Sequence, residues 1–441
     1  MSRLSKSGIF RTLASILLAS IIGSQAVQAA ITGTTVTVKE LNISLSTELT
    51  VPVTEYSANN KTLLIWIPSE FGIFPKKQAP VARGLSMRGI DVWYADLHDA
   101  YFVQRGRNSV DKFKATDIGL LMLKAIDKGY TKITLIGSAG SARPLLRAAR
   151  YWQSKNSSSK NLKHLNTLVG LILFHPSLYA SRPDAGVEAQ FIPETFATNV
   201  PVYIIQPTFS TAIYRVRHLL KSIRSAGAPV WIHFLHDVKD GFQANISRHQ
   251  RQIDIKTRQQ LPSYLASAIK RMSLKSIPST LAVLPKYIPK TQDTLPGLKP
   301  FNAQTIRTLS LTDIKDKTKS LKSFRGEVLL VSFWASWCPP CIREMPSINR
   351  LSQHFKNKKF RVVSVNIGET KADINKFLNK HSLRGEVLMD PTLNAYKKWK
   401  IYVIPSNFLI DKNGKMRYTS IGAVDWDTKP IRNIINKLIA E

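Results

Sequence analysis

An apolar run that leads into two closely spaced cysteines constrains this chain more than any other feature. Residues 328–334 are apolar almost throughout, and the motif Cys-Pro-Pro-Cys follows at residues 338–341. Residues 340–355 have helical spacing, so a helix is predicted to begin at this motif. Prolines in the first turn cost little, because those N–H groups have no intrahelical partner. The sequence therefore predicts that Cys338 lies where a buried strand ends and a helix begins.

This position favours redox chemistry at both sulfurs. Unpaired N–H groups and the helix dipole stabilise a thiolate at a helix start, so Cys338 is predicted to ionise easily and to attack. Two intervening residues bring the Cys341 sulfur within bonding distance, while its place one turn along makes it less exposed. Cys341 is therefore the predicted resolving thiol, which attacks the mixed disulfide and releases the reduced partner.

Cys338 and Cys341 are the only cysteines among the 441 residues. A disulfide closing so short a loop removes little chain entropy, so the pair is interpreted as reactive and not as a staple. Zinc is the alternative for such a motif. A zinc site requires two more Cys or His ligands that lie close together in sequence. This part of the chain offers only His354 and His381, which are too far apart in sequence to form such a pair. We expect no metal, and no cofactor besides the Cys338–Cys341 disulfide.

The first 29 residues have the order of a secretory signal. Three basic residues are followed by an apolar run over residues 13–22 and then by Val27-Gln28-Ala29. We expect cleavage after Ala29, since the run is shorter than the roughly 20 apolar residues of a membrane span. The alternative is an uncleaved anchor. The predicted location is periplasmic or otherwise extracytoplasmic, where thiols either pair or do redox chemistry.

The formal net charge is +34, and no single tail holds it, since residues 30–295 carry +17 and residues 296–441 carry +14. Such a charge favours adhesion to nucleic acid, anionic lipid or an acidic partner. Export and the absence of a nucleic-acid motif exclude nucleic acid from the expected partners. Association with an anionic envelope surface or an acidic protein remains, beside the simpler interpretation of a solvated basic surface.

The sequence predicts two α/β domains separated by a linker. Between residues 271 and 300 helical periodicity is lost and five prolines occur, which is typical of a semi-extended linker. Upstream, in residues 30–270, short apolar runs alternate with amphipathic stretches, which predicts a mostly parallel sheet covered on both faces. Those predicted strands are residues 63–67, 90–95, 133–136, 168–174, 202–205 and 230–235, and two of the intervening helices are residues 111–128 and 142–154.

Downstream, in residues 301–441, the pattern predicts a small sheet with one crossover unit and one hairpin. Asn413-Gly414 is the predicted hairpin turn, because its backbone tolerates positive φ. The predicted strands are residues 328–334, 361–366, 407–410 and 415–421, and the predicted helices are residues 340–355, 371–380 and 429–440.

Four separated motifs in this second half agree in order and spacing with one family. They are residues 321–326, 333–346, 365–369 and 404–414. Together they resemble the TlpA/ResA family of extracytoplasmic thioredoxin-like proteins over about residues 296–441. The resemblance implies a thioredoxin-like fold, thiol:disulfide exchange with protein disulfides as substrates, and a membrane electron donor of DsbD-like type.

The resemblance also implies roles for particular residues. Pro405 is expected to be cis and to face the disulfide, so that the backbone at Ile404 pairs with an extended substrate segment. Glu344 matches the family's acidic residue and is expected to exchange a proton with the thiols; the alternative is a solvated carboxylate paired with Arg343 or Arg350. Trp337 is expected to contact substrate and Trp334 to lie in the core. The candidate substrate-contacting residues are Trp337, Pro339, Pro340, Ile404 and Pro405.

The first half resembles a different family and lacks that family's catalytic groups. Residues 133–154 resemble the strand, sharp turn and helix of an α/β-hydrolase, but Ala139 stands where the pattern G-x-S-x-G places its nucleophile. Other expected catalytic positions hold Pro68-Ser69, Thr208-Phe209-Ser210 and Asp240-Gly241-Phe242. A Ser/His/Asp catalytic triad does not work without its nucleophile or its base. Over about residues 35–270 we therefore expect a degenerate α/β-hydrolase-like binding module. The alternative is a hydrolase with Ser138, Ser141 and His236 as substitutes.

The whole sequence thus predicts a secreted thiol:disulfide oxidoreductase that reduces protein disulfides. Oxidase or isomerase activity stays open, because residue types alone do not give the direction of exchange. A second alternative is a binding protein with an accessory redox domain.

Overall fold

The computed structural model describes residues 35–106, 108–157, 162–180, 185–187, 189–244, 251–286, 297–301 and 308–441. The predicted signal and residues 287–296 of the predicted linker lie outside these ranges. The chain divides into two compact units. Unit 1 consists of Met1–Ser177, Thr198–Pro207 and Ala226–Val283, and unit 2 consists of Leu178–Ala197, Thr208–Ser225 and Leu284–Glu441. The predicted domain boundaries themselves stay predictions.

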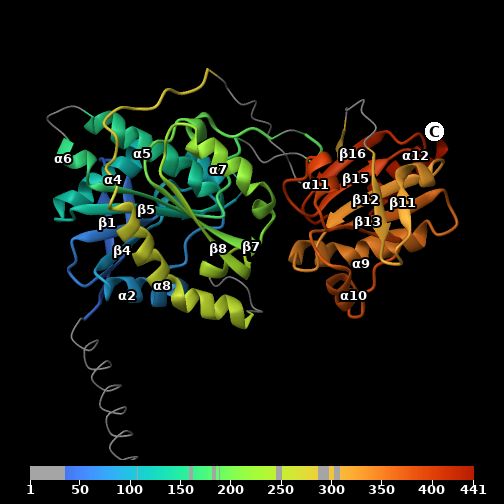
Figure 1. The fold of residues 1–441 in the computed structure, drawn as a ribbon, viewed down its shortest axis with the longest axis horizontal. Helices are drawn as coiled ribbons and strands as arrows, with labels where there is room; N and C mark the ends of the chain where they lie inside the picture. The colour runs from blue at the N-terminus through green and yellow to red at the C-terminus, as the bar shows by residue number, and fades with distance from the viewer. Residues whose placement is uncertain are drawn as a thin grey trace, which may run out of the picture. The chain divides into compact units, whose positions relative to one another are not determined.

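Unit 1 is built on an eight-stranded sheet with the spatial order β1-β2-β4-β3-β5-β6-β7-β8 (Figure 1). The run from β4 to β7 is parallel, whereas β1 and β2 pair antiparallel at one edge. The strands are β1 (Thr37–Ser44), β2 (Thr50–Ser57), β3 (Thr62–Trp66), β4 (Ile90–Ala95), β5 (Lys132–Ser138), β6 (Leu168–Phe174), β7 (Val202–Phe209) and β8 (Val230–Lys239).

Helices cover this sheet on either side, with α2 packed on α8 and α4 packed on α5 (Figure 1). Every residue of β4 and β6 is buried, which explains why their sequences do not alternate and are apolar apart from Asp91 in β4. No helix within the described ranges is long and apolar enough to cross a bilayer. The helices are α2 (Pro75–Ser86), α3 (Leu97–Ala100), α4 (Ala115–Asp127), α5 (Ala142–Asn156), α6 (Leu162–Leu165) and α8 (Gln252–Met272).

Unit 2 contains a second sheet, with the spatial order β11-β10-β14-β13-β12-β15-β16-β9. Its strands are β9 (Lys299–Pro300), β10 (Ser310–Asp313), β11 (Thr318–Ser320), β12 (Val328–Trp334), β13 (Phe360–Ile367), β14 (Glu386–Asp390), β15 (Ser406–Ile410) and β16 (Met416–Ile421). Its helices are α7 (Val216–Arg224), α9 (Pro339–His354), α10 (Lys371–Leu378), α11 (Asn394–Lys398) and α12 (Lys429–Ala440).

Strand β12 lies at the centre of this unit. It runs parallel to β13, with Trp334 opposite Asn366, and antiparallel to β15. Its side chains alternate between two cores. Val328 and Leu330 pack with residues of α12, while Val331 and Phe333 pack in the cluster that contains both cysteines. Strand β12 thus fixes the start of the loop that leads to Cys338.

Candidate functional site

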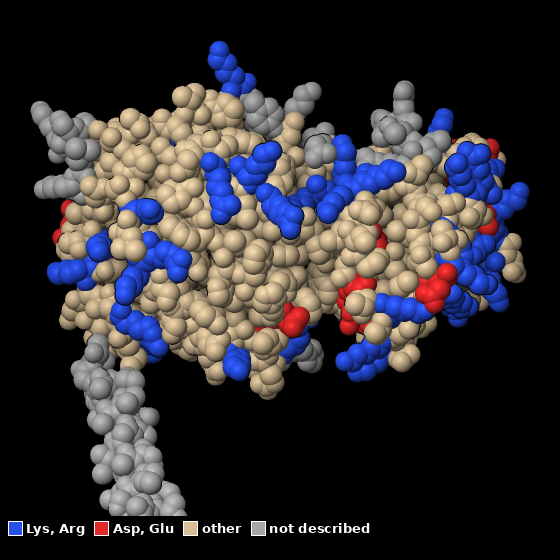
Figure 2. All heavy atoms as spheres, viewed as in Figure 1, with Lys and Arg blue, Asp and Glu red and all other residues tan. Residues whose placement is uncertain are grey.

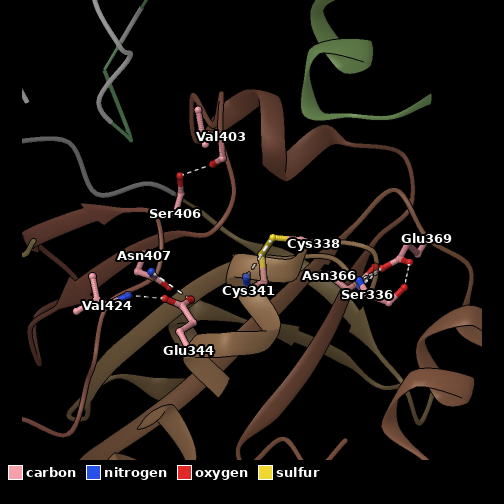
Figure 3. The surroundings of a disulfide bond; sticks show 10 residues. All are labelled: Ser336, Cys338, Cys341, Glu344, Asn366, Glu369, Val403, Ser406, Asn407 and Val424. Atoms are coloured by element: carbon pink, nitrogen blue, oxygen red, sulfur yellow. Dashed lines mark hydrogen bonds between the residues drawn. A yellow bond between two sulfur atoms is a disulfide. The ribbon is translucent and has the colours of Figure 1, made fainter. Parts of the chain in front are cut away.

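Cys338 caps the N-terminus of α9. Its φ of −94° and ψ of 100° are extended, and helical geometry begins at Pro339, one residue earlier than the sequence predicted. The Cys341 N–H donates to Cys338 Sγ at 3.2 Å (Figure 3). An N-cap side chain that accepts such a bond satisfies a helix-end donor, and a thiolate is a better acceptor than a thiol. The predicted placement of Cys338 between a buried strand and a helix is confirmed.

The two sulfurs form a disulfide, with 5.3 Å between the Cα atoms. Cys338 is 3% exposed and Cys341 is 1% exposed. The predicted order of exposure holds, but Cys338 is more buried than expected for an attacking thiol. Pro339 is exposed and Pro340 is half-buried. The described residues contain no cluster of three or more His, Cys, Asp or Glu side chains that could hold a metal.

The Ile404–Pro405 peptide bond is cis, as the family resemblance implied. It follows Val403, whose carbonyl accepts a hydrogen bond from Ser406 Oγ at 2.6 Å, and it leads directly into β15. Ile404 is 7% exposed and belongs to the same core cluster as both cysteines. The structure therefore brings this turn and the redox pair together. The pairing of Ile404 with a substrate segment stays a prediction.

Glu344 is buried, with 3% of its surface exposed, and not a solvated helix carboxylate. Its Oε1 accepts a hydrogen bond from Asn407 Nδ2 at 3.4 Å, and its Oε2 accepts one from the Val424 N–H at 3.2 Å (Figure 3). Burial raises the pKa of Glu344 to about 8, because these hydrogen bonds only partly replace the lost solvation. The carboxyl group therefore changes charge near neutral pH.

Trp334 lies in the core at 2% exposure, as predicted, whereas Trp337 is half-buried. Within unit 2 the Trp337 ring stacks on the ring of Phe209, with 6.0 Å between centroids and 14° between planes. Phe209 comes from the segment Thr208–Ser225, which precedes the redox motif by more than a hundred residues. No sequence pattern predicted that this segment groups with unit 2.

Glu369 is a site residue to which sequence reasoning gave no role. Its carboxylate accepts three hydrogen bonds (Figure 3). The Ser336 N–H donates to Oε2 at 2.7 Å, Asn366 Nδ2 donates to the same oxygen at 2.6 Å, and the Ser336 hydroxyl donates to Oε1. In the view of Figure 3, Glu369 and Glu344 lie on opposite sides of the disulfide. A carboxylate directly after a buried parallel strand is a signal that could have marked it.

The sharp turn between β5 and α5 in unit 1 has strained backbone geometry at a residue that carries no nucleophile. Ala139, between β5 and α5, has a φ of +50°. The Ser141 hydroxyl donates to the Ser138 carbonyl and accepts the Ser138 N–H, both at 2.8 Å, so it serves the turn itself. His236 is exposed on β8. In the part of the chain that the structure describes, no hydrogen bond joins His236 to either serine, so the structure does not assemble the substitute triad.

Comparison with known proteins gives one family match and several similar proteins. Residues 291–435 match the Redoxin family. The chain is 33% identical over 114 residues to the thiol-disulfide oxidoreductase ResA of Geobacillus kaustophilus, covering 26% of this chain and 66% of that protein. It is 29% identical over 106 residues to ResA of Bacillus subtilis, covering 24% of this chain and 59% of that protein. The chain thus spans slightly less than two thirds of the length of these relatives.

A solved structure described as a putative thiol:disulfide interchange protein DsbE from Chlorobium tepidum is 30% identical. The match covers 30% of this chain and 94% of the chain in that structure, with a TM-score of 0.29. The Redoxin match includes the cysteine pair, the cis proline and the strands between them. Residues 291–435 thus match the Redoxin family, and part of the chain is similar to thiol-disulfide oxidoreductases.

Proposed function

We propose that this protein is an extracytoplasmic thiol:disulfide oxidoreductase that reduces protein disulfides through Cys338 and Cys341. One observation carries the proposal: Cys338 Sγ accepts the Cys341 N–H at the start of α9. This arrangement stabilises a negative sulfur without a metal or a neighbouring base. The ResA relatives support the same chemistry for the region they match.

The exchange proceeds in two steps from the dithiol form. The Cys338 thiolate attacks one sulfur of a substrate disulfide; the substrate S–S bond breaks, and its other sulfur leaves as a thiolate and takes a proton. Cys341 then loses its proton and attacks Cys338 Sγ, which breaks the mixed disulfide and releases the second substrate thiol. Two electrons have passed to the substrate. A membrane dithiol donor of DsbD-like type, implied by the family resemblance, would reduce the Cys338–Cys341 disulfide again.

Glu344 is the proposed proton acceptor for Cys341. It lies three residues further along α9 and is therefore on the same face of the helix. Its raised pKa, caused by burial, makes a carboxylate there a stronger base than an exposed one. The proposed substrate-contacting residues are Trp337, Pro339, Pro340, Ile404 and Pro405.

For unit 1 we propose a degenerate α/β-hydrolase-like binding module. The parallel strands β3 to β7 and the positive φ of Ala139 at the β5–α5 turn support that fold. Ala139 has no nucleophilic atom, and the Ser141 hydroxyl is engaged by Ser138, which favours binding over hydrolysis. Covalent linkage to the redox region would raise the effective concentration of anything that unit 1 holds.

A trapping experiment tests the proposed reaction. In the Cys341→Ser chain the nucleophile remains and the resolving thiol is gone, so mixed disulfides with substrate proteins accumulate in cells of the source organism. They are detected as adducts that dithiothreitol releases on gels. The Cys338→Ser chain is the control and forms none. Equal adducts from both variants, or none from Cys341→Ser, would contradict the proposal.

We further propose that unit 2 associates with the anionic envelope surface through a basic cavity. The cavity has a volume of about 780 Å³ and lies between the β10–β11 turn, the end of α10 and the start of β14. Basic residues dominate the charged groups in its lining: Lys315, Lys317, Lys319, Lys380 and His381. Lysine and arginine side chains are also spread over the face shown in Figure 2, where acidic ones are few.

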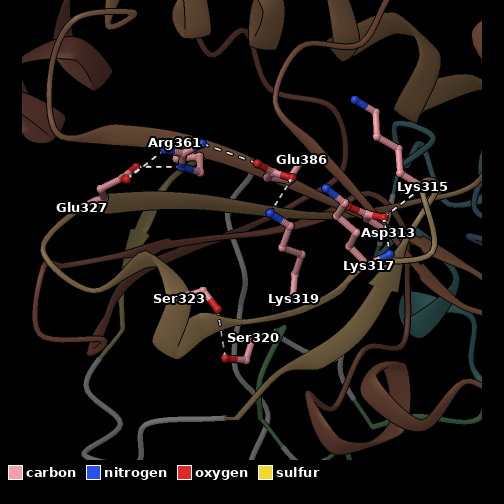
Figure 4. Close-up of polar contacts among 9 residues, drawn as sticks. All are labelled: Asp313, Lys315, Lys317, Lys319, Ser320, Ser323, Glu327, Arg361 and Glu386. Carbon is pink, nitrogen blue, oxygen red and sulfur yellow. Dashed lines mark hydrogen bonds and ion pairs between the residues drawn. The ribbon is translucent and has the colours of Figure 1, made fainter.

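The carboxylates of this cavity are already engaged (Figure 4). Asp313 Oδ1 accepts the N–H groups of Lys315 and Lys317 at 2.8 and 2.9 Å, and these bonds hold the pKa of Asp313 below its usual range. Glu386 Oε1 lies 3.4 Å from Arg361 Nη1, and Glu386 Oε2 lies 4.0 Å from Lys319 Nζ. Among the described residues no carboxylate pairs with Lys315, Lys317 or Lys380, which leaves their charge for an external anion.

Charge reversal tests this surface. We expect Lys315→Glu with Lys317→Glu to weaken binding of the full chain to phosphatidylglycerol vesicles by about tenfold or more, since a lysine near an anionic membrane contributes about 1 kcal/mol. Vesicle sedimentation measures the affinity. The matched control is Lys429→Glu with Lys437→Glu on α12, which does not line the cavity. An equal loss in both pairs would indicate general electrostatic attraction and refute the cavity as the binding site.

A further inference from the structure

We infer that Glu369 is a positioning residue that holds the loop before Cys338 in its reactive geometry; the inference rests on the proposed function. Two parallel neighbours, β12 and β13, end side by side, with Trp334 opposite Asn366. Ser336 follows β12 and Glu369 follows β13. The carboxylate therefore joins the carboxyl ends of two adjacent strands, directly at the loop that carries the redox motif.

The Trp337–Phe209 ring contact and a backbone hydrogen bond also hold this loop. The Cys338 N–H donates to the Ala335 carbonyl at 3.2 Å, which closes a tight turn around Ser336 and Trp337. The Ser336 N–H points out of that turn and donates to Glu369 Oε2. A half-buried backbone donor without an acceptor is costly, so removal of the carboxylate would drive this turn to rearrange. Only one residue, Trp337, separates Ser336 from Cys338.

The carboxylate is itself held in place. Asn366 is 1% exposed, and its Nδ2 donates to Glu369 Oε2. Thr370, the next residue, caps α10 by accepting the Asp373 N–H, so the backbone on the other side of Glu369 is also fixed. Charge-assisted bonds from three donors converge on two fixed oxygens, which makes Glu369 a rigid anchor. Displacement of the turn would move Cys338 Sγ away from the Cys341 N–H that stabilises its thiolate.

A positioning role and a purely electrostatic role of Glu369 predict opposite changes at Cys338, and two variants of Glu369 distinguish them. In Glu369→Gln the amide oxygen can still accept from Ser336 N–H and Asn366, while the Ser336 hydroxyl can rotate to accept from the amide N–H. Glu369→Ala removes all three bonds. A positioning role therefore predicts that Cys338 keeps most of its reactivity in Glu369→Gln and loses it in Glu369→Ala. A purely electrostatic role predicts that both variants lower the Cys338 pKa alike, because a nearby carboxylate disfavours a thiolate.

The test measures iodoacetamide alkylation against pH in the full chain with Cys341→Ser, which leaves Cys338 as the only thiol. We expect Glu369→Ala to slow alkylation at pH 7 by about tenfold to a hundredfold and to raise the apparent pKa of Cys338, as loss of a supporting residue does in other preorganised sites. Glu369→Gln should remain within about threefold of its parent, by the same reasoning. Ser336→Ala, which loses only the hydroxyl bond, should fall between them.

The matched control is Glu327→Ala. Glu327 precedes β12 at the opposite end of that strand and makes a two-bond pair with Arg361, at 2.8 and 2.9 Å (Figure 4). It should leave alkylation unchanged although it too removes a paired carboxylate. Unchanged alkylation in Glu369→Ala, or equal shifts in Ala and Gln, would overturn the inference while leaving the proposed function intact. If Glu369→Ala does not fold, an unchanged rate in Ser336→Ala has the same force. A parent chain whose Cys338 is inert would overturn both.

Discussion

Cys338→Ser abolishes disulfide reduction by the full chain. With insulin as substrate and dithiothreitol as reductant, we expect the rate of insulin precipitation to fall to that of dithiothreitol alone. The physical reason is that Cys338 is the N-cap of α9, where its sulfur receives the Cys341 N–H. A serine hydroxyl placed there has far too high a pKa to ionise, so the helix start has no anion to stabilise and no nucleophile forms.

Cys341→Ser gives the informative contrast to this variant. It keeps the nucleophile and should form about one mixed disulfide per chain with an excess of oxidised glutathione, by the stoichiometry of the first exchange step. Cys338→Ser should form much less, because Cys341 lies within α9 and lacks the N-cap position that favours a thiolate. Thermal unfolding of both variants, compared with the reduced wild type, checks that they fold. Insulin reduction that persists in Cys338→Ser would show that the assignment of the nucleophile is wrong.

Much of the redox region could be predicted from sequence because its central elements are continuous and well bounded. Strand β12 and helix α12 occupy the predicted residues, and β13, β15 and β16 differ by one residue at one or both ends. Strand β12 is buried at every position, and the shortness of its apolar run favours a buried strand over a buried helix. The hairpin turn at Asn413-Gly414 follows the same logic, since Gly414 has a φ of +84°.

Several of the strands that were missed are short or only partly buried, although β2, with eight mostly buried residues, is an exception. Strand β14 is five residues long and begins at the half-buried Glu386, and β10 and β11 are shorter still. In unit 1, β1 is exposed along most of its length, so it lacks the apolar signal of the central strands. Such strands are held by their neighbours in the sheet, and hydrophobic periodicity alone does not reveal them.

The candidate site divides in the same way. Cys338, Cys341 and Glu344 lie on one helix start, so local spacing was enough to relate them. Glu369 acts on Ser336, which is 33 positions away in sequence. That contact exists only because β12 and β13 are parallel neighbours with a particular register. The burial of Glu344 is likewise a property of the fold: Asn407 and Val424, which bond it, lie beyond α9 on β15 and after β16.

The burial of Glu344 makes the stability of unit 2 depend on pH. Burial raises its pKa to about 8 in the folded chain, above the ordinary value of 4.5. The folded state therefore holds a proton that the unfolded state releases, and stability falls as pH rises from about 4.5 to about 8, by up to about 1.4 kcal/mol per pH unit. Below this interval the contribution is complete. Glu344→Gln cannot lose a proton there, so its stability should vary much less across the interval.

Hydrogen exchange of peptides from α9 and β15 in the full chain, measured between pH 5 and 9 and corrected for intrinsic exchange rates, reports this stability locally. The control is Glu386→Gln, which removes a carboxylate paired with Arg361 at a distance from the redox pair and should keep the wild-type pH dependence.

The titration of Glu344 should also affect the rate of thiol:disulfide exchange. If Glu344 accepts the Cys341 proton, the rate at which mixed disulfides resolve rises with an inflection near pH 8 in the wild type, and Glu344→Gln loses that inflection. An identical inflection in both proteins would assign the titration to another group and leave Glu344 as a buried structural acid.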